Sequence, residues 1–157
     1  MKEFGDLKLK GYSTEQALDF LIQNYNYLLH GSRVDIEGNF LTPNEDNDVF
    51  ATDLGAIALL KSIISNKGLV FPGVCYPYHI DENNPLEVRI HGLHENTIGK
   101  EGFIYVIENT SGFENNPEGS WQYIKTGSEV PFIEKIKVYR ADFTYPIYDA
   151  FKDELIE

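Results

Sequence analysis

The hydrophobic pattern of the chain changes its period near Gly68, and this change constrains the fold more than any other feature of the sequence. Before Gly68, apolar residues recur at helical spacing in two segments, which begin near Ser13 and near Thr52 or Asp53. After Gly68, apolar and polar residues alternate, as they do in strands with one buried face. Helical segments followed by strands are typical of an α+β fold, and 157 residues without a linker or repeat predict a single domain over residues 1–157.

The N-terminal part of the chain predicts an arm, a capped helix and a short strand. Residues 1–12 are charged and weakly patterned, which favours an arm or an edge strand. Ser13 and Gln16 have capping-box spacing, in which the two residues satisfy each other's free amide groups. The helix that starts there is expected to end near Asn26, and residues 28–30 follow as a short strand.

A hairpin is expected next, because residues 33–36 and 40–41 flank the turn-forming tripeptide Glu37-Gly38-Asn39. A second helix, capped by Thr52 or Asp53, is expected to show its inner face at Ile57, Leu60 and Ile64. Later strands are expected at 69–71, 86–90, 103–107, 121–124 and 133–138, and the tail at 145–157 is expected to form a turn or a short terminal helix.

Charge and cysteine content limit the partners and the compartment. The 25 acidic residues exceed the 13 basic ones, which gives a formal net charge of −12. Such a chain is repelled by a phosphate backbone, so nucleic acid is not expected as a partner. The single cysteine, Cys75, excludes an intrachain disulfide, and residues 1–6 have no apolar signal region, so a cytoplasmic protein is expected. The apolar runs are too short to span a membrane, so no membrane partner is expected.

The tripeptide His30-Gly31-Ser32 directly follows Leu28-Leu29, at the end of the first short strand, and is a candidate site. Gly31 has no Cβ, so a ligand can approach its backbone. His30 and Ser32 supply hydrogen-bond donors and acceptors on either side. The same residues also fit a turn with a satisfied histidine, so they indicate a site only together with segments further along the chain.

Two further segments complete a pattern. Residues 49–53 read as a strand that runs into a capped helix, and residues 102–143 read as a series of strands that includes Trp121-Gln122-Tyr123-Ile124. In this order the three segments resemble the ADP-ribosyltransferase-like superfamily, which binds NAD and includes poly-ADP-ribose polymerases, diphtheria-type toxins and RNA 2'-phosphotransferases. The resemblance covers about residues 27–143, and within the superfamily the chain is most similar to small bacterial or phage members. It implies a fold with N-terminal helices and a mainly antiparallel split β-sheet.

The resemblance also implies an activity and roles for single residues. The protein would bind NAD as a substrate and transfer ADP-ribose to an acceptor, such as a protein, with release of nicotinamide. His30 would hydrogen-bond the adenosine ribose, the Gly31 backbone would pair with the nicotinamide amide, and Ser32 would help to hold the ribose. Phe50 would stack on the nicotinamide ring, with Thr52 beside it at a helix N-terminus that favours the diphosphate.

The third segment departs from the family pattern. The family's catalytic glutamate precedes an aromatic residue on a late strand, where it bonds the nicotinamide ribose and stabilises the positive charge that develops there. The matching place here reads Gln122-Tyr123, and glutamine carries no charge. Three interpretations stay open: the chain binds NAD with weak or no transfer, Glu129 further along supplies the carboxylate, or the register of the resemblance is different.

Two other classes of function compete with this interpretation. A β-rich metal-binding protein would draw on a group of histidines and carboxylates, namely His79, Asp81, His91, His94 and Glu101. However, His91 and His94 are three positions apart, which on a strand places them on opposite faces. A protein-interaction module without a small-molecule site would suit the acidic surface and the many tyrosines, and it predicts that a His30→Ala substitution is tolerated.

Overall fold

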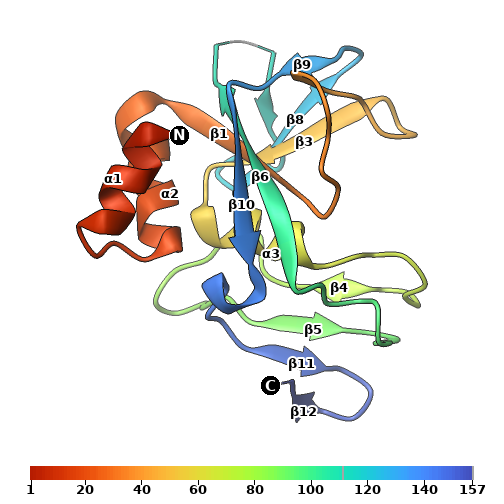
Figure 1. Cartoon of the computed structure of the whole chain (residues 1–157). Helices are drawn as coiled ribbons and strands as arrows, with labels where there is room; N and C mark the ends of the chain where they lie inside the picture. Colours follow the sequence, from red (N-terminus) through yellow and green to blue (C-terminus); the bar gives the residue numbers. More distant parts are fainter. Residues whose placement is uncertain (111, 157) are drawn as a thin grey trace.

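Three α-helices and several small β-sheets form the computed structural model, which describes residues 1–110 and 112–156 (Figure 1). α1 spans Lys2–Leu9, α2 spans Thr14–Tyr25 and α3 spans Gly55–Ile63, and a single turn of 3-10 helix, η1, spans Arg140–Asp142. The combination of helices with mainly antiparallel sheets confirms the predicted α+β class. Within the described residues, no helix has the length and apolar character that a membrane crossing requires.

The strands form a six-stranded, a four-stranded and a two-stranded sheet. The six-stranded sheet is antiparallel, in the order β10-β6-β1-β3-β8-β7. The four-stranded sheet has the order β12-β11-β5-β4, with β5 and β11 parallel, and β2 pairs with β9. The strands are β1 (Tyr27–Ser32), β2 (Phe40–Leu41), β3 (Asp48–Thr52), β4 (Val74–Cys75), β5 (Val88–Ile90), β6 (Glu101–Glu108), β7 (Glu114–Asn115), β8 (Gln122–Thr126), β9 (Val130–Pro131), β10 (Glu134–Tyr139), β11 (Ile147–Asp149) and β12 (Glu154–Leu155).

The predicted capping box at the start of α2 is confirmed. The Ser13 side chain accepts a hydrogen bond from the Gln16 N–H at 3.1 Å, and the Gln16 side chain accepts one from the Ser13 N–H at 2.9 Å. Asn26 ends the helix in the left-handed conformation, at φ 54°, which asparagine adopts more readily than most residues. Because β1 begins at the next residue, the end of α2 determines where His30 lies.

α3 lies between the six-stranded and the four-stranded sheet and forms the centre of the core (Figure 1). Its residues are buried on every side except at Lys61. One apolar cluster joins α3 to Val88 of β5 and to Ile104 of β6. A helix that is apolar on all sides is stable only when neighbouring elements cover all of them. We expected one inner face, at Ile57, Leu60 and Ile64. The structure instead buries almost the whole circumference of this helix.

Two glycines allow α3 to lie directly against the six-stranded sheet. A Cβ at Gly31 would lie 2.1 Å from the Ala58 carbonyl oxygen, and a Cβ at Gly102 would lie 1.8 Å from the Ser62 carbonyl oxygen. Both distances are far below van der Waals contact, so a side chain at either position would force the helix and the sheet apart. The side of Gly31 that we expected to admit a ligand therefore faces α3.

Several predictions of local structure are wrong. Residues 1–12 contain the helix α1, which has Leu7 as its single buried residue and so shows little helical pattern. Residues 40–41 pair with β9 and not with residues 33–36, so the pairing is made by segments far apart in the sequence. Residues 69–71 lie in a loop before β4. The tail forms β11 and β12 around a turn, because Ile147 is buried and pairs with β5.

Candidate functional site

The register of three neighbouring strands brings separate segments of the sequence together. Leu29 of β1 pairs with Thr52 of β3, and Thr52 pairs with Gln122 of β8. A pocket of about 180 Å³, called here the ring pocket, is built around this row of residues and α3. Five of the seven candidate residues line it: His30, Gly31, Phe50, Thr52 and Gln122. The rest of its wall consists of Leu29, Ala51, Ile57, Lys61 and Trp121.

His30 is held in one tautomer by a backbone carbonyl. Its Nδ1 lies 2.6 Å from the Phe50 carbonyl oxygen, so Nδ1 carries a proton and donates it. Burial lowers the pKa of His30, the hydrogen bond to Phe50 opposes this, and the nearby Lys61 charge lowers the pKa further. The imidazole is therefore neutral at pH 7, and its Nε2 remains a hydrogen-bond acceptor that suits a ligand hydroxyl or amide.

Phe50 and Thr52 lie on the same face of β3 but have different roles. Phe50 is 36 % exposed although it is apolar and belongs to an inner strand of the sheet, so it offers an aromatic surface to the pocket. Thr52 is 3 % exposed, and its hydroxyl oxygen accepts a hydrogen bond from the Leu54 N–H at 3.1 Å. Thr52 therefore also orients the chain where α3 begins.

Two residues outside the predicted set, Lys61 and Trp121, complete the wall of the ring pocket. The Trp121 ring stacks on Tyr76 and Tyr78, with ring centroids 5.4 and 5.2 Å apart, and its Nε1 donates to the Pro77 carbonyl oxygen at 2.9 Å. Lys61 Nζ lies 5.4 Å from the Tyr76 ring centroid and 5.9 Å from that of Trp121, within the range of cation–π attraction. Both residues carry a sequence signal, because Lys61 is the one charged residue of α3 and Trp121 is the one tryptophan of the chain.

Lys61 is the one exposed residue of α3, and the pocket walls beside it remove part of its hydration. This desolvation lowers the pKa of Lys61, and the neighbouring Tyr78 acts in the opposite direction. Within residues 1–110 and 112–156, Lys61 takes part in no ion pair. The side chain is thus a partly desolvated cation without a protein counter-charge.

Ser32 and Glu129 do not line the ring pocket. Ser32 Oγ accepts a hydrogen bond from the Val34 N–H at 3.0 Å and so belongs to the loop after β1. Glu129 is exposed and follows the Thr126 end of β8, whereas Gln122 forms the other end of that strand. The length of β8 alone separates its two ends by about 13 Å. The fold therefore keeps the Glu129 carboxylate away from the pocket.

The N-terminus of α3, which we expected to favour a diphosphate, is occupied by a side chain of the protein itself. Asp19 Oδ1 of α2 accepts a hydrogen bond from the Gly55 N–H at 2.7 Å. The N-cap residue is Leu54, and neither Thr52 nor Asp53 takes that position as predicted. A ligand anion at this helix end would meet the Asp19 carboxylate, so this end does not offer an anion site.

Two of the three histidines considered for a metal site, His91 and His94, hydrogen-bond to the backbone. His94 Nε2 lies 2.9 Å from the Lys67 carbonyl oxygen, and its Nδ1 accepts from the Asn96 N–H at 3.2 Å. His91 Nδ1 lies 3.0 Å from the Gly73 carbonyl oxygen. In the part of the chain that the structure describes, no three His, Cys, Asp or Glu side chains are grouped so that they could hold a metal ion.

Three kinds of surface therefore meet in the ring pocket: aromatic rings, a neutral imidazole and a lysine ammonium group. Together they fit a ligand that has a planar ring, hydroxyl groups and a negative charge. Comparisons of the chain with protein-family models, with curated proteins and with solved structures found no match. The function of this pocket must therefore be inferred from its own geometry and chemistry.

Proposed function

We propose that the protein is an ADP-ribosyltransferase-like protein that binds NAD in the ring pocket, with weak or absent transfer of ADP-ribose. One observation carries this proposal: three segments distant in the sequence, which contain His30, Phe50 and Gln122, line the same pocket. These are the segments through which the chain resembles the superfamily. The N-terminal helices and the mainly antiparallel sheets on either side of α3 are consistent with the fold that this resemblance implies.

The size of the ring pocket supports a particular orientation of the ligand. Its volume of about 180 Å³ is below the range of about 300–1,000 Å³ that is usual for drug-sized molecules. It therefore accommodates one end of a dinucleotide and not the whole molecule. Phe50 and Trp121 offer aromatic surface for the nicotinamide ring, and the neutral His30 can accept a hydrogen bond from a ribose hydroxyl.

Gln122 limits the chemistry that follows binding. Departure of nicotinamide leaves positive charge on the ribose, and a carboxylate beside it would stabilise that charge. The Gln122 amide can hydrogen-bond a ribose hydroxyl but carries no charge. The described residues that line the ring pocket include neither Asp nor Glu. We therefore expect NAD to bind and to release nicotinamide only slowly.

Calorimetric titration of NAD into the wild-type protein and into His30→Ala tests the proposal. We expect saturable binding by the wild type and at least about tenfold weaker binding by the variant, a loss of about 1.4 kcal/mol. His79→Ala is the matched control, because His79 is an exposed histidine that does not line the ring pocket. It should bind NAD as the wild type does.

A further variant separates a role in folding from a role in binding. His30→Ala also removes the hydrogen bond to the Phe50 carbonyl, so its melting temperature must be measured beside its affinity. His30→Asn keeps a side-chain N–H that can donate to this carbonyl but removes the free Nε2 acceptor. A folded His30→Asn protein with wild-type affinity, or a folded wild type that binds no NAD at millimolar concentration, would refute the proposal.

A further inference from the structure

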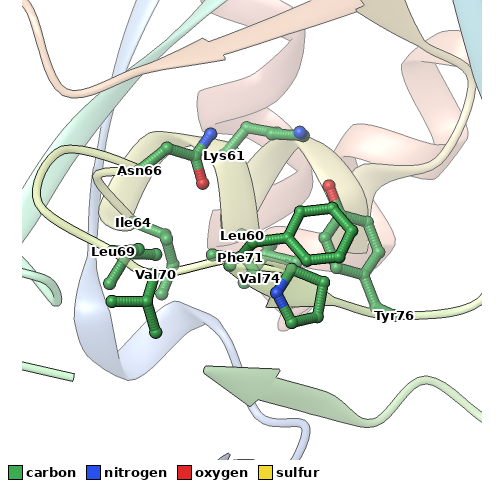
Figure 2. Close-up of a pocket in the computed structure, with 11 residues that line it drawn as sticks. Leu60, Lys61, Ile64, Asn66, Leu69, Val70, Phe71, Val74 and Tyr76 are labelled. Atoms are coloured by element: carbon green, nitrogen blue, oxygen red, sulfur yellow. The ribbon is translucent and has the colours of Figure 1, made fainter. Parts of the chain in front are cut away.

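A second and larger pocket, of about 360 Å³, also has Lys61 in its wall. The end of α3, Asn66, residues 69–74 and Tyr76 enclose this outer pocket. Figure 2 shows the Lys61 ammonium group at the Phe71 and Tyr76 end of the outer pocket, with Asn66 and Leu69 toward the other end. Lys61 is the residue that the outer pocket and the ring pocket share.

The two pockets that share Lys61 differ from three other pockets in the acidic residues of their walls. Although the chain has 25 Asp and Glu residues, none of the described residues that line the ring pocket or the outer pocket is acidic. Three other hollows have carboxylates in their walls, namely Asp53 and Asp81 in one, Asp48 and Glu114 in another, and Glu108 in the third. An anionic ligand therefore meets fewer carboxylates in the two pockets around Lys61 than in these three hollows.

The position of Lys61 also favours an anion. The Lys61 side chain is exposed toward the two pockets and has no counter-charge among the described residues, so it is free to pair with an anionic ligand. The Tyr76 and Trp121 rings lie beside the ammonium group and help to fix its position. The other candidate for an anion site, the N-terminus of α3, is occupied by Asp19.

The outer pocket further has an apolar rim that an aromatic base can cover. Phe71 is 98 % exposed and Val70 is 49 % exposed, and both line this pocket. Exposed apolar residues next to each other at a pocket are typical of a binding surface. Lys61 lies between the ring pocket and the outer pocket. This arrangement fits a ligand that has a ring at each end and an anionic group between the two rings.

We propose that Lys61 binds the diphosphate of a dinucleotide that spans both pockets. The nicotinamide end occupies the ring pocket, so His30 would meet the nicotinamide ribose and not the adenosine ribose that the resemblance implies. The adenosine end lies in the outer pocket against Phe71. The identity of the dinucleotide rests on the proposed function, whereas the anion site rests on Lys61 and the absence of acidic residues from the described walls of both pockets.

Calorimetric titrations at low salt test this assignment with four probes: NAD, ADP-ribose, nicotinamide and inorganic pyrophosphate. Lys61→Met keeps a long unbranched side chain and removes the charge, so it should weaken the three phosphate-containing probes by about tenfold or more and leave nicotinamide unchanged. Lys61→Arg restores a cation and should recover most of the affinity. Lys67→Met removes an exposed lysine that does not line either pocket and should change nothing.

The outcomes distinguish this inference from the proposed function. NAD binding that is lost in His30→Ala but unchanged in Lys61→Met would overturn the role of Lys61 and leave the proposed function intact. A different result would support the anion site and refute the proposed function: the wild type binds pyrophosphate but not NAD, and Lys61→Met no longer binds pyrophosphate. A second measurement needs no variant: the affinity of the wild type for ADP-ribose must fall as salt is added, and a salt-independent affinity would overturn the proposal.

Discussion

At the scale of single residues, the proposed function makes Gln122 the residue that limits cleavage of bound NAD. We expect Gln122→Glu to raise the rate of nicotinamide release by about 10²-fold, because electrostatic stabilisation of charge in a transition state is worth about 10²–10³ in rate. The measurement is nicotinamide release from NAD by the purified variant. Gln23→Glu adds the same charge at an exposed position on α2 and should leave the rate unchanged. An unchanged rate in a Gln122→Glu protein that still binds NAD would contradict the placement of the reacting ribose beside Gln122.

Gly31 has a structural role that can be tested separately from binding. We expect Gly31→Ala to lower the free energy of unfolding by about 3 kcal/mol or more, because the new Cβ would meet the Ala58 carbonyl, a backbone group that cannot rotate away. Urea unfolding measures the change. Gly5→Ala in α1 is the control: its Cβ would have nothing within 4 Å, so this variant should be unchanged or more stable by about 0.5–1 kcal/mol. A Gly31→Ala protein as stable as the wild type would show that α3 can move away from β1.

The candidate residues were only partly predictable from the sequence. His30, Phe50 and Gln122 could be chosen because each lies in a short segment with its own pattern, and strand register then brings them to one pocket. Trp121 was assigned to a strand and not to the site, because nothing local indicates that it stacks on Tyr76 and Tyr78. The sequence does not indicate Lys61, because its proposed role depends on the outer pocket. The wall of that pocket is formed largely by loop residues that carry no site pattern of their own.

At the scale of elements, the contact between α2 and the start of α3 gives a pH-dependent prediction. Burial raises the pKa of Asp19 above the ordinary value of 3.8, so between 3.8 and the raised value the native state binds more protons than the unfolded state. The contribution of this group to stability therefore falls as the pH rises through that range. Asp19→Asn keeps an oxygen that can accept from the Gly55 N–H and does not titrate. We expect the wild type to lose stability relative to this variant as the pH rises from 3.8 through the raised pKa of Asp19.

Urea unfolding of both proteins at several pH values measures this difference. Asp46→Asn, in an exposed loop, removes a carboxylate that does not contact the start of a helix, and it should not reproduce the effect. Wild type and Asp19→Asn with parallel pH profiles would contradict the prediction. If the wild type instead gains stability relative to the variant toward pH 7, the hydrogen bond from the Gly55 N–H lowers the pKa of Asp19 by more than burial raises it.

Elements with a strong local pattern were predictable, and elements defined by distant partners were not. The capping box of α2 and the apolar strand β6 are each indicated by residues a few positions apart, and both are confirmed. By contrast, β2 exists because it pairs with β9, and β11 because it pairs with β5. A segment of two or three residues carries too little periodicity to indicate a strand whose partner is far along the chain. α1 was missed for a related reason, since Leu7 is its one buried residue.

At the scale of the whole molecule, the chain is acidic, but the ring pocket and the outer pocket are not. The net charge is −12, yet the described walls of the two pockets that share Lys61 contain no carboxylate. The ion pairs found elsewhere, such as Arg89 with Asp153 and Lys137 with Glu101, are exposed and so contribute little to stability. The net charge therefore implies like-charge repulsion across the surface, and the proposed anion site implies a local attraction at Lys61.

These two effects predict opposite responses to salt. Raising the ionic strength from about 0.01 M to 0.15 M shortens the Debye length from about 30 Å to about 8 Å. Weaker self-repulsion should raise the melting temperature, by about 2–4 °C for each kcal/mol gained in a chain of this size. The affinity for ADP-ribose should fall over the same range, because screening weakens its attraction to Lys61. Lys61→Met should keep the rise in melting temperature and lose most of the salt dependence of binding, whereas equal salt dependence in both proteins would place the diphosphate away from Lys61.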